Sequence, residues 1–200
     1  KYTGLTLAAI LLLVFVGGFL FTSLSPQFGG SPTEAQVASY EKSGHFEKGL
    51  FVNNTPTSMA MDWPTIKTLL RDYVVGVPNL APENLLPVLK VDSLSIVNRP
   101  DTLTRLTWFG FLLEMEGKNI LLDPMFGDSP SPVSWLGSHR FTEGLPIEIE
   151  QLPAIDAVFF SHDHYDHLDY ESVMRLKDKV KDFYVPLGVG AHLVAWGVAE

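Results

Sequence analysis

The chain has 200 residues, of which 46% are hydrophobic, with no cysteine and a formal net charge of −9. This length suits one domain with a short appendage. The absence of cysteine excludes disulfides and thiolate metal ligands. The negative charge argues against a nucleic-acid partner, because phosphate binding requires basic patches. Any metal ion would therefore have to be held by histidine and carboxylate side chains.

The beginning of the chain contains an uncharged stretch, Gly4–Leu24. A helix of this length spans about 30 Å, the thickness of the hydrocarbon core of a bilayer. A cleaved signal peptide has a shorter apolar core, and the best candidate cleavage site, at 23–25, is followed by Pro26. A buried core helix is the other alternative, but an apolar surface on every side argues against it. We predict a single-pass transmembrane helix within a membrane anchor over residues 1–25.

Basic residues are unevenly placed around this stretch. Lys1 precedes it, and the next Lys or Arg is Lys42. Because cytoplasmic flanks carry the excess of basic residues, the pattern favours a cytoplasmic N-terminus. The remainder of the chain, with any catalytic domain, is then expected on the extracytoplasmic side.

Between the anchor and residue 90, turn-forming residues separate short elements. The expected elements are a linker (26–43) with a short helix inside it (33–42), an irregular stretch (44–56), a helix (63–73) and an extended covering segment (78–87). The linker opens with the Pro/Gly/Ser-rich residues SPQFGG. Apolar residues at helical spacing after Pro64 indicate the second helix.

Strands dominate from residue 92 onward and then alternate with helices. The expected elements are strands at 103–109 and 111–115, a hairpin turn at 116–119, a strand at 120–122, a long loop at 125–153, a buried strand at 155–160, a helix at 169–179 capped by Asp169, a strand at 182–185 and a helix at 188–196. A loop as long as 125–153 tends to be functional or lid-like. This order indicates a sheet with helices on its outer face, in an α/β or α+β layered domain.

Three of the six histidines lie in the ten residues SHDHYDHLDY, directly after the apolar run 155–160. His162, His164 and His167, with Asp166 between the last two, form the pattern H-x-H-x-D-H. Imidazole and carboxylate are the ligands that Zn²⁺ accepts when no thiolate is available. Ordinary surface histidines are the alternative. The spacing nevertheless predicts half of a two-metal site, with 162 and 164 facing one point and the adjacent pair 166–167 a second.

This loop and its neighbours resemble a known family. SHDHYDHLD is similar to the signature of the metallo-β-lactamase fold superfamily. The segments that resemble one branch, N-acylphosphatidylethanolamine-hydrolysing phospholipase D and its bacterial relatives, are TWFG (107–110), ILLDPMFGDSPSPVSWLGSHRF (120–141), LPAIDAVFFSHDHYDHLD (152–169) and FYVPLGVGAHLVAWGV (183–198). The resemblance covers about residues 44–200. It implies an αββα sandwich, of which this chain would supply the first half.

The resemblance also implies roles for five residues. His162 and His164 would bind one Zn²⁺ ion, and Asp166 and His167 would bind a second. Asp166 is also the candidate catalytic residue. Asp123, at the end of the strand in LLDP, would orient a ligand without binding the metal, although an ordinary strand-end aspartate explains it equally well.

Two features depart from the family pattern. Relatives place a histidine and a small residue after the W-x-G strand, whereas here Gly110 is followed directly by Phe111. The family's remaining ligands come from the second half of the fold, and four ligands are too few for a two-zinc site. We therefore expect residues 44–200 to form the N-terminal part of a larger hydrolase domain. The remaining histidines are expected to have loop or packing roles: His45, His139 and His192.

Three functions fit these expectations. The branch resemblance favours a membrane-anchored, zinc-dependent phosphodiesterase of the phospholipase D type, acting on N-acylphosphatidylethanolamine-like phospholipids. A lactonase or amidase on the same scaffold is the second, because activated water attacks carbon as well as phosphorus. The third is a non-catalytic metal-binding subunit of a membrane complex. Apolar residues of the long loop could meet acyl chains or simply pack: Met125, Phe126, Trp135, Leu136 and Phe141.

Overall fold

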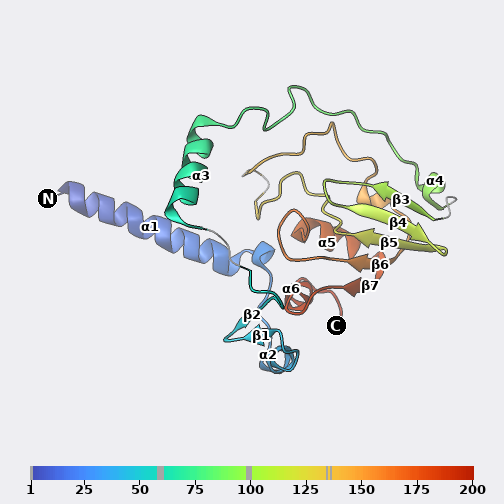
Figure 1. Cartoon of the computed structure of the whole chain (residues 1–200), viewed down its shortest axis with the longest axis horizontal. Coiled ribbons are helices and arrows are strands. Elements are labelled where there is room, and N and C mark those ends of the chain that lie inside the picture. Colours follow the sequence, from blue (N-terminus) through green and yellow to red (C-terminus); the bar gives the residue numbers. More distant parts are fainter. Residues whose placement is uncertain (1, 58–60, 98–100, 134, 136) are drawn as a thin grey trace.

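The structure, a computed structural model, describes residues 2–57, 61–97, 101–133, 135 and 137–200. Within these residues a five-stranded mixed sheet, in the order β3-β4-β5-β6-β7, forms the centre of the folded part. A long helix, α1, projects away from it (Figure 1). The layered α/β architecture expected from the sequence is thus confirmed as a mixed sheet with helices beside it.

Helix α1 (Tyr2–Leu24) is continuous, as predicted. From Gly4 onward its side chains are exposed, and within the described residues 0% of its most apolar window is buried. It is long and apolar enough to cross a membrane, and an N-terminal signal sequence passes the same test. Whether α1 is a membrane span or a signal sequence, its large apolar surface lies outside the folded part of the chain.

The stretch after α1 contains a turn of 3₁₀ helix, η1 (Pro26–Phe28), and helix α2 (Glu34–Glu41). Thr33, the first residue of the helix expected at 33–42, caps α2. Its Oγ1 accepts from the Gln36 N–H at 3.3 Å, and the Gln36 Oε1 accepts from the Thr33 N–H at 2.8 Å. These two hydrogen bonds satisfy backbone groups that would otherwise be unpaired, so the helix begins sharply at Glu34.

A small hairpin follows where no regular structure was expected. Strands β1 (Phe46–Glu47) and β2 (Leu50–Phe51) pair antiparallel across Lys48 and Gly49, both with positive φ. The rings of Phe46 and Phe51 lie 4.8 Å apart, and both contact Tyr40 of α2. Strands of two residues are too short to show a periodic pattern, and the aromatic contacts stabilise them.

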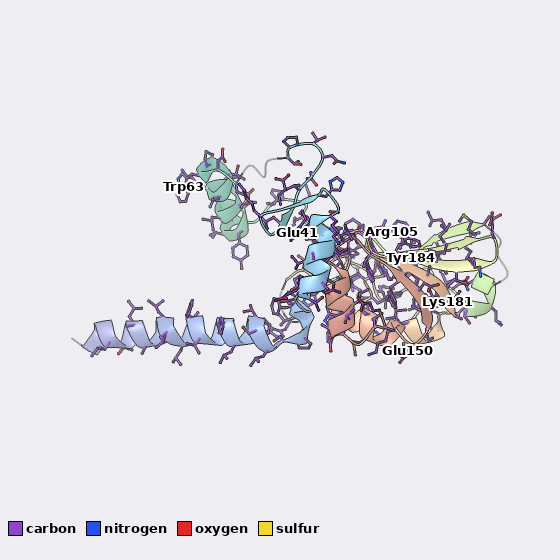
Figure 2. The ribbon with its side chains drawn as sticks, turned by 90° about the horizontal axis from the view of Figure 1, so that it is seen from below. Glu41, Trp63, Arg105, Glu150, Lys181 and Tyr184 are labelled. Atoms are coloured by element: carbon purple, nitrogen blue, oxygen red, sulfur yellow. The ribbon has the colours of Figure 1, made fainter. Side chains whose placement is uncertain are left out.

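Helix α3 (Trp63–Val75) begins at the cap residue Asp62, whose carboxylate accepts from the Thr65 N–H at 3.0 Å. The helix buries no side chain against the described residues, and it lies away from the sheet in both views (Figures 1 and 2). The chain then runs extended along the long loop: the Leu86 N–H donates to the Phe141 carbonyl at 2.6 Å. The predicted covering segment is therefore present, and a short helix, α4 (Ser93–Val97), ends it.

The sheet combines antiparallel and parallel pairing. Strands β3 (Thr102–Arg105), β4 (Phe111–Met115) and β5 (Lys118–Leu122) are antiparallel, whereas β6 (Ile155–Phe159) and β7 (Val180–Tyr184) run parallel to β5. Several expected boundaries were wrong, among them that of β7, which begins at Val180 and not at 182, and two that flank β4. β3 ends early because the Leu106 N–H donates to the Gly110 carbonyl at 2.8 Å and closes a turn. β5 begins early because only Glu116 and Gly117, with φ of 51° and 73°, form its hairpin turn.

Only one face of the sheet is covered within the described residues. Leu112, Leu121 and Val158 occupy adjacent positions on β4, β5 and β6 and are fully buried. They belong to one hydrophobic cluster with residues of the helices α5 (Tyr170–Leu176) and α6 (Gly190–Ala195) and of the 3₁₀ turn η2 (Ile149–Gln151). The opposite face carries large apolar side chains that are 41–59% exposed: Leu103, Met115, Phe159 and Tyr184.

Candidate metal centre

The His/Asp loop is held at both ends. At its start, the Phe160 side chain is buried, and its N–H donates to the Tyr184 carbonyl at 3.0 Å. At its end, Leu168 is buried, and Asp169 caps α5 by accepting from the Ser172 N–H at 2.9 Å. The loop therefore spans a fixed gap between β6 and α5, and its polar side chains are presented from a rigid base.

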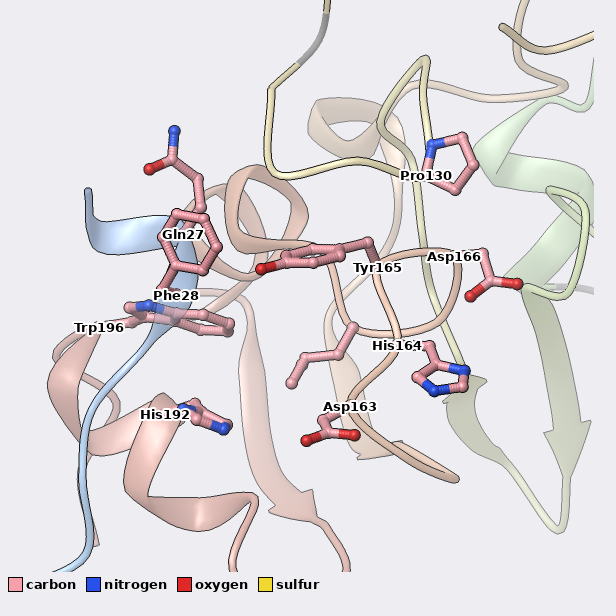
Figure 3. Close-up of a pocket in the computed structure, with 10 residues that line it drawn as sticks. Gln27, Phe28, Pro130, Asp163, His164, Tyr165, Asp166, His192 and Trp196 are labelled. Atoms are coloured by element: carbon pink, nitrogen blue, oxygen red, sulfur yellow. The ribbon is translucent and has the colours of Figure 1, made fainter. Parts of the chain in front are cut away.

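Three of the predicted ligands converge. His162, His164 and Asp166 each offer one ligand atom, and these atoms lie within 4.8 Å of one another. His164 is exposed, and the other two are half-buried. Figure 3 shows the side chains of His164 and Asp166 on one side of the loop, while Tyr165 extends the other way toward Phe28. Nitrogen and oxygen donors at this spacing fit a divalent ion such as Zn²⁺.

The fourth predicted ligand, His167, is held by Asp123. The His167 Nδ1 lies 2.9 Å from the Asp123 Oδ2. The same carboxylate accepts from the Ser161 N–H and the Ser161 hydroxyl, each at 2.7 Å. Because an ionised carboxylate only accepts, Nδ1 must carry the proton. The lone pair of Nε2, 3.7 Å from the Asp166 Oδ2, is then available to a metal ion.

Asp123 reaches this position because of the sheet. It directly follows β5 and adopts a left-handed φ of 43°. Its N–H donates to the Phe159 carbonyl at 2.9 Å, which brings the ends of β5 and β6 together. Adjacent parallel strands end at the same edge, so Asp123 and the His/Asp loop meet there.

An aromatic residue that sequence reasoning did not single out also contacts the centre. The Phe109 ring stacks on His167, with centroids 4.7 Å apart and planes at 19°. Phe109 lies in the tight turn before Gly110. A Cβ added at Gly110 would be 2.4 Å from the Thr107 Oγ1 and 3.1 Å from the Asp123 carbonyl oxygen. Glycine is therefore required for the turn to pack against the end of β5. The position of Phe109 after Trp108, in the segment that carries the family resemblance, was the available signal.

A cavity of about 980 Å³ lies next to this turn. The covering segment, the turn before β4 and the long loop line it, and Phe109 is one of its lining residues. Of the loop residues proposed to meet acyl chains, Met125 and Phe141 line this cavity, whereas Phe126 is buried in the core. Trp135 is 78% exposed, and Leu136 lies outside the described residues. The loop thus contributes in part to a cavity and in part to packing.

Two of the other three histidines, His192 and His139, make packing and loop contacts. His192 packs on Trp196, and its Nδ1 accepts from the Gly30 N–H at 3.2 Å. The His139 Nδ1 lies 2.7 Å from the Asp128 Oδ2. Burial raises the pKa of Asp128, but the hydrogen bonds from His139 and Arg140 outweigh it and lower the pKa below its ordinary value. This pair joins two parts of the long loop that are 11 positions apart.

Comparisons with known proteins find relatives for parts of the chain. Residues 118–200 match the model of the family described as "Beta-lactamase superfamily domain". An uncharacterized protein of Mycobacterium tuberculosis is 35% identical over 203 residues, which cover 98% of this chain and 54% of that protein. N-acyl-phosphatidylethanolamine-hydrolyzing phospholipase D 1 of Caenorhabditis elegans is 39% identical over 98 residues, covering 46% of this chain and 27% of that protein. The chain spans about half the length of the mycobacterial relative.

Among solved structures, isothiocyanate hydrolase from Delia radicum gut bacteria matches with a TM-score of 0.39 and 28% identity, over 49% of this chain and 39% of that one.

A further sequence relative, a metal-dependent hydrolase of Saccharolobus solfataricus, is 29% identical over 96 residues, covering 46% of this chain and 36% of that protein. Over residues 118–200, which the family model matches, the resemblance to the metallo-β-lactamase superfamily is confirmed, and relatives in the N-acylphosphatidylethanolamine-hydrolysing phospholipase D branch match 46% of the chain.

Proposed function

We propose that the chain is part of a membrane-anchored, zinc-dependent phosphodiesterase that cleaves N-acylphosphatidylethanolamine-like phospholipids. The observation that carries this proposal is the convergence of the His162, His164 and Asp166 ligand atoms within 4.8 Å, beside a histidine oriented by Asp123. The phospholipase D relatives support the choice of a phosphodiester. They match less than half of the chain, so the substrate belongs to the proposal.

Each residue has a role in this proposal. His162 and His164 hold one ion, and Asp166 and His167 hold a second. A carboxylate oxygen of Asp166 lies within 4.8 Å of ligand atoms of His162 and His164, and its Oδ2 lies 3.7 Å from the His167 Nε2. This position between the two proposed ions supports Asp166 as the candidate catalytic residue. Bound divalent ions supply Lewis acidity and lower the pKa of water to about 7. Asp123 keeps the proton on the His167 Nδ1 and so keeps the Nε2 lone pair directed toward Asp166.

The surroundings fit a lipid better than a small polar molecule. The lining of the cavity of about 980 Å³ includes Phe109, whose ring stacks on His167. Apolar side chains such as Met125 and Phe141 line it and would contact an acyl chain. The exposed apolar helix α1 would hold the centre at a bilayer surface, where only lipid head groups project. The net charge of −9 does not oppose an anionic substrate, since bound ions are the largest local charges.

The open face of the sheet supports the proposed αββα sandwich. Large apolar side chains on that face are half-exposed, and parallel strands such as β5, β6 and β7 are usually covered on both faces. The mycobacterial relative is nearly twice as long as the matched region. We propose that a second layer, supplied by further polypeptide, covers this face and brings the remaining metal ligands.

Metal content tests the first part of the proposal. We expect the full-length protein to hold two zinc ions per chain by mass spectrometry, and His162→Ala/His164→Ala to lose at least one. His139→Ala is the matched control, since it removes an exposed imidazole that pairs with Asp128 and is absent from the converging group among the described residues. Full metal content in the double variant would overturn the assignment.

Substrate turnover tests the second part. We expect the metal-loaded protein to release the head group from N-acylated or ordinary phosphatidylethanolamine in vesicles, leaving phosphatidic acid behind. A panel of lactones and β-lactams serves as the comparison. Turnover of that panel with inert phospholipids would favour the lactonase or amidase, and metal binding without any turnover would favour a non-catalytic subunit.

A further inference from the structure

The residues that follow α1 are packed against the far end of the chain. We name residues 26–30 the strap. The Trp196 Nε1–H donates to the Pro26 carbonyl at 2.7 Å, and the Gly30 N–H donates to the His192 Nδ1 at 3.2 Å. Figure 3 shows Gln27 and Phe28 beside Trp196. The predicted linker therefore begins with a segment that is fixed to α6 and its C-terminal end.

Two glycines permit this contact. Gly29 has a φ of 71°, and an added Cβ would lie 2.0 Å from the His192 Nδ1 and 2.5 Å from its Cγ. At Gly30 an added Cβ would lie 2.6 Å from the Ala195 Cβ and 2.9 Å from the Ala191 carbonyl oxygen. Any side chain at either position would force the strap away from α6.

Aromatic rings connect the strap to both α1 and the metal loop. The Phe28 ring meets Phe21 of α1 edge-to-face at 5.3 Å. It also meets Tyr165 edge-to-face at 6.4 Å. Tyr165 lies between His164 and Asp166, two of the converging ligands. Packing thus continues from the end of the apolar helix to the backbone of the candidate site.

We infer that the strap fixes the orientation of the metal loop relative to the bilayer that α1 enters, so that the site meets a substrate presented by that same bilayer. If these five residues formed a flexible connection, its ends would lie on average about 11–13 Å apart, and the orientation of the metal loop relative to α1 would not be fixed. This inference rests on the proposed function for the existence of a bilayer substrate. The strap itself positions the site and takes no part in the chemistry.

Gly29→Ala is the variant that breaks the strap, and Gly44→Ala is its matched control. Gly44 has a φ of 74°, so alanine is equally strained there, but among the described residues no atom lies within 4 Å of the added Cβ. Trp196→Phe is a second variant, which removes the hydrogen bond to Pro26 and retains an aromatic ring in the core. Agreement between Gly29→Ala and Trp196→Phe would separate loss of the strap from general misfolding.

Energy transfer tests the orientation without any activity. These 200 residues contain no cysteine, so Lys181→Cys provides one labelling site within them, on the part of the sheet remote from α1 (Figure 2), and any cysteine elsewhere in the full-length protein is replaced by serine. The labelled full-length protein is reconstituted in phosphatidylethanolamine/phosphatidylcholine vesicles that carry an acceptor on the lipid head group. We expect Gly29→Ala and Trp196→Phe to change and broaden the distance distribution, and Gly44→Ala to leave it unchanged. Identical distributions in all variants would overturn the inference.

Turnover provides the second readout. We compare a long-chain phospholipid in the vesicles with soluble bis(4-nitrophenyl) phosphate. Since small misplacements of a site cost up to about a hundredfold in rate, we expect Gly29→Ala to lower the vesicle-to-soluble rate ratio by roughly tenfold or more. Equal losses on both substrates would overturn the strap's positioning role. If the wild type cleaves neither substrate, the proposed function fails, and the energy-transfer result still decides the role of the strap.

Discussion

The carboxylate of Asp123 organises the candidate centre through three hydrogen bonds. It accepts from the Ser161 N–H, the Ser161 hydroxyl and the His167 Nδ1. The first fixes the start of the loop, and the last fixes the ring of a predicted ligand. Asp123 and His167 are each less than one-fifth exposed, so water competes weakly for these bonds. Both the position and the protonation of His167 therefore depend on one residue outside the H-x-H-x-D-H motif.

Asp123→Asn is expected to weaken metal binding about 10–100-fold without unfolding the protein. Asparagine tolerates the left-handed φ of Asp123, so the backbone is retained. The Ser161 N–H requires an oxygen opposite it, which places the amide NH₂ of asparagine against the His167 Nδ1. The proton of His167 would then move to Nε2, where it blocks coordination. Titration against a competing chelator measures the change in affinity.

Asp163→Asn is the control for this prediction. It removes a carboxylate of the same loop, and Asp163 is absent from the converging group among the described residues. We expect near wild-type metal affinity in that variant and an unchanged circular dichroism spectrum in both. Wild-type affinity in Asp123→Asn would contradict the orienting role.

The first turn of α5 connects the helix to the long loop. Ser172 is 1% exposed; its hydroxyl donates to the Asp169 carboxylate, which caps the helix, and accepts from the Phe126 N–H at 2.8 Å. Ser172→Ala would leave the buried Phe126 N–H without a partner. We expect the free energy of unfolding, measured in urea, to fall by about 1–3 kcal/mol. Thr68→Ala, which alters an exposed hydroxyl of α3, should have a much smaller effect, and equal effects would contradict this account.

An ion pair joins η2 to α5 and predicts a pH dependence. The Nε and Nη2 atoms of Arg175 lie 2.9 and 2.8 Å from the two carboxylate oxygens of Glu150. These hydrogen bonds lower the pKa of Glu150 from 4.5 to about 2. A carboxyl group with a lowered pKa in the folded state stabilises that state above its unfolded pKa. The contribution is therefore present at neutral pH and is lost as pH falls from 4.5 toward 2.

Glu150→Gln tests this dependence. We expect its Tm to lie below that of the wild type at about pH 7, and the difference to shrink as pH falls below 4.5 and to disappear only when pH falls through about 2. The effect is modest because Glu150 is exposed and solvent screens the pair. In an Arg175→Gln background the same substitution should have little effect. A Tm difference that does not depend on pH would show that the pair is not its source.

Features that act over a short stretch of sequence were the best predictors of the helix starts and of the His/Asp loop. Thr33, Asp169 and the spacing of the loop histidines act through neighbours in the chain, so helix starts and the converging ligands could be anticipated. The strap could not, because Gly29 and His192 are 163 positions apart and a Pro/Gly-rich stretch gives no sign of a distant contact. The Phe109 stack on His167 was missed for the same reason. Strands β1 and β2 are simply too short to show a period.

Membrane attachment is the prediction that concerns the entire chain. Helix α1 exposes apolar side chains on all its surface and makes few contacts with the folded part, so its burial has to come from elsewhere. We expect detergent, and not high salt, to release the protein from membranes. Val14→Arg places a charge at the middle of the span and should reduce insertion, at a cost of about 2.5–3.5 kcal/mol.

Leu24→Arg is the control for this prediction, because a long basic side chain at the helix end reaches the interface. We expect it to insert like the wild type. Membrane fractionation after alkaline extraction distinguishes the variants. Release of the wild-type protein by salt alone would show that α1 does not span the bilayer.

The pairing of β5 with β6 has a consequence for the order of events in folding. Strands β3, β4 and β5 are joined by tight turns, and hairpins of this kind form in about 1–10 μs. Asp123 and Ser161, by contrast, are 38 residues apart, and closing that loop carries an entropic cost that the hairpins avoid. Asp123 and the His/Asp loop come together only when this contact forms. During refolding, the β-sheet signal should therefore appear before the chain can take up metal, and a delay between the two would report the closure of the site.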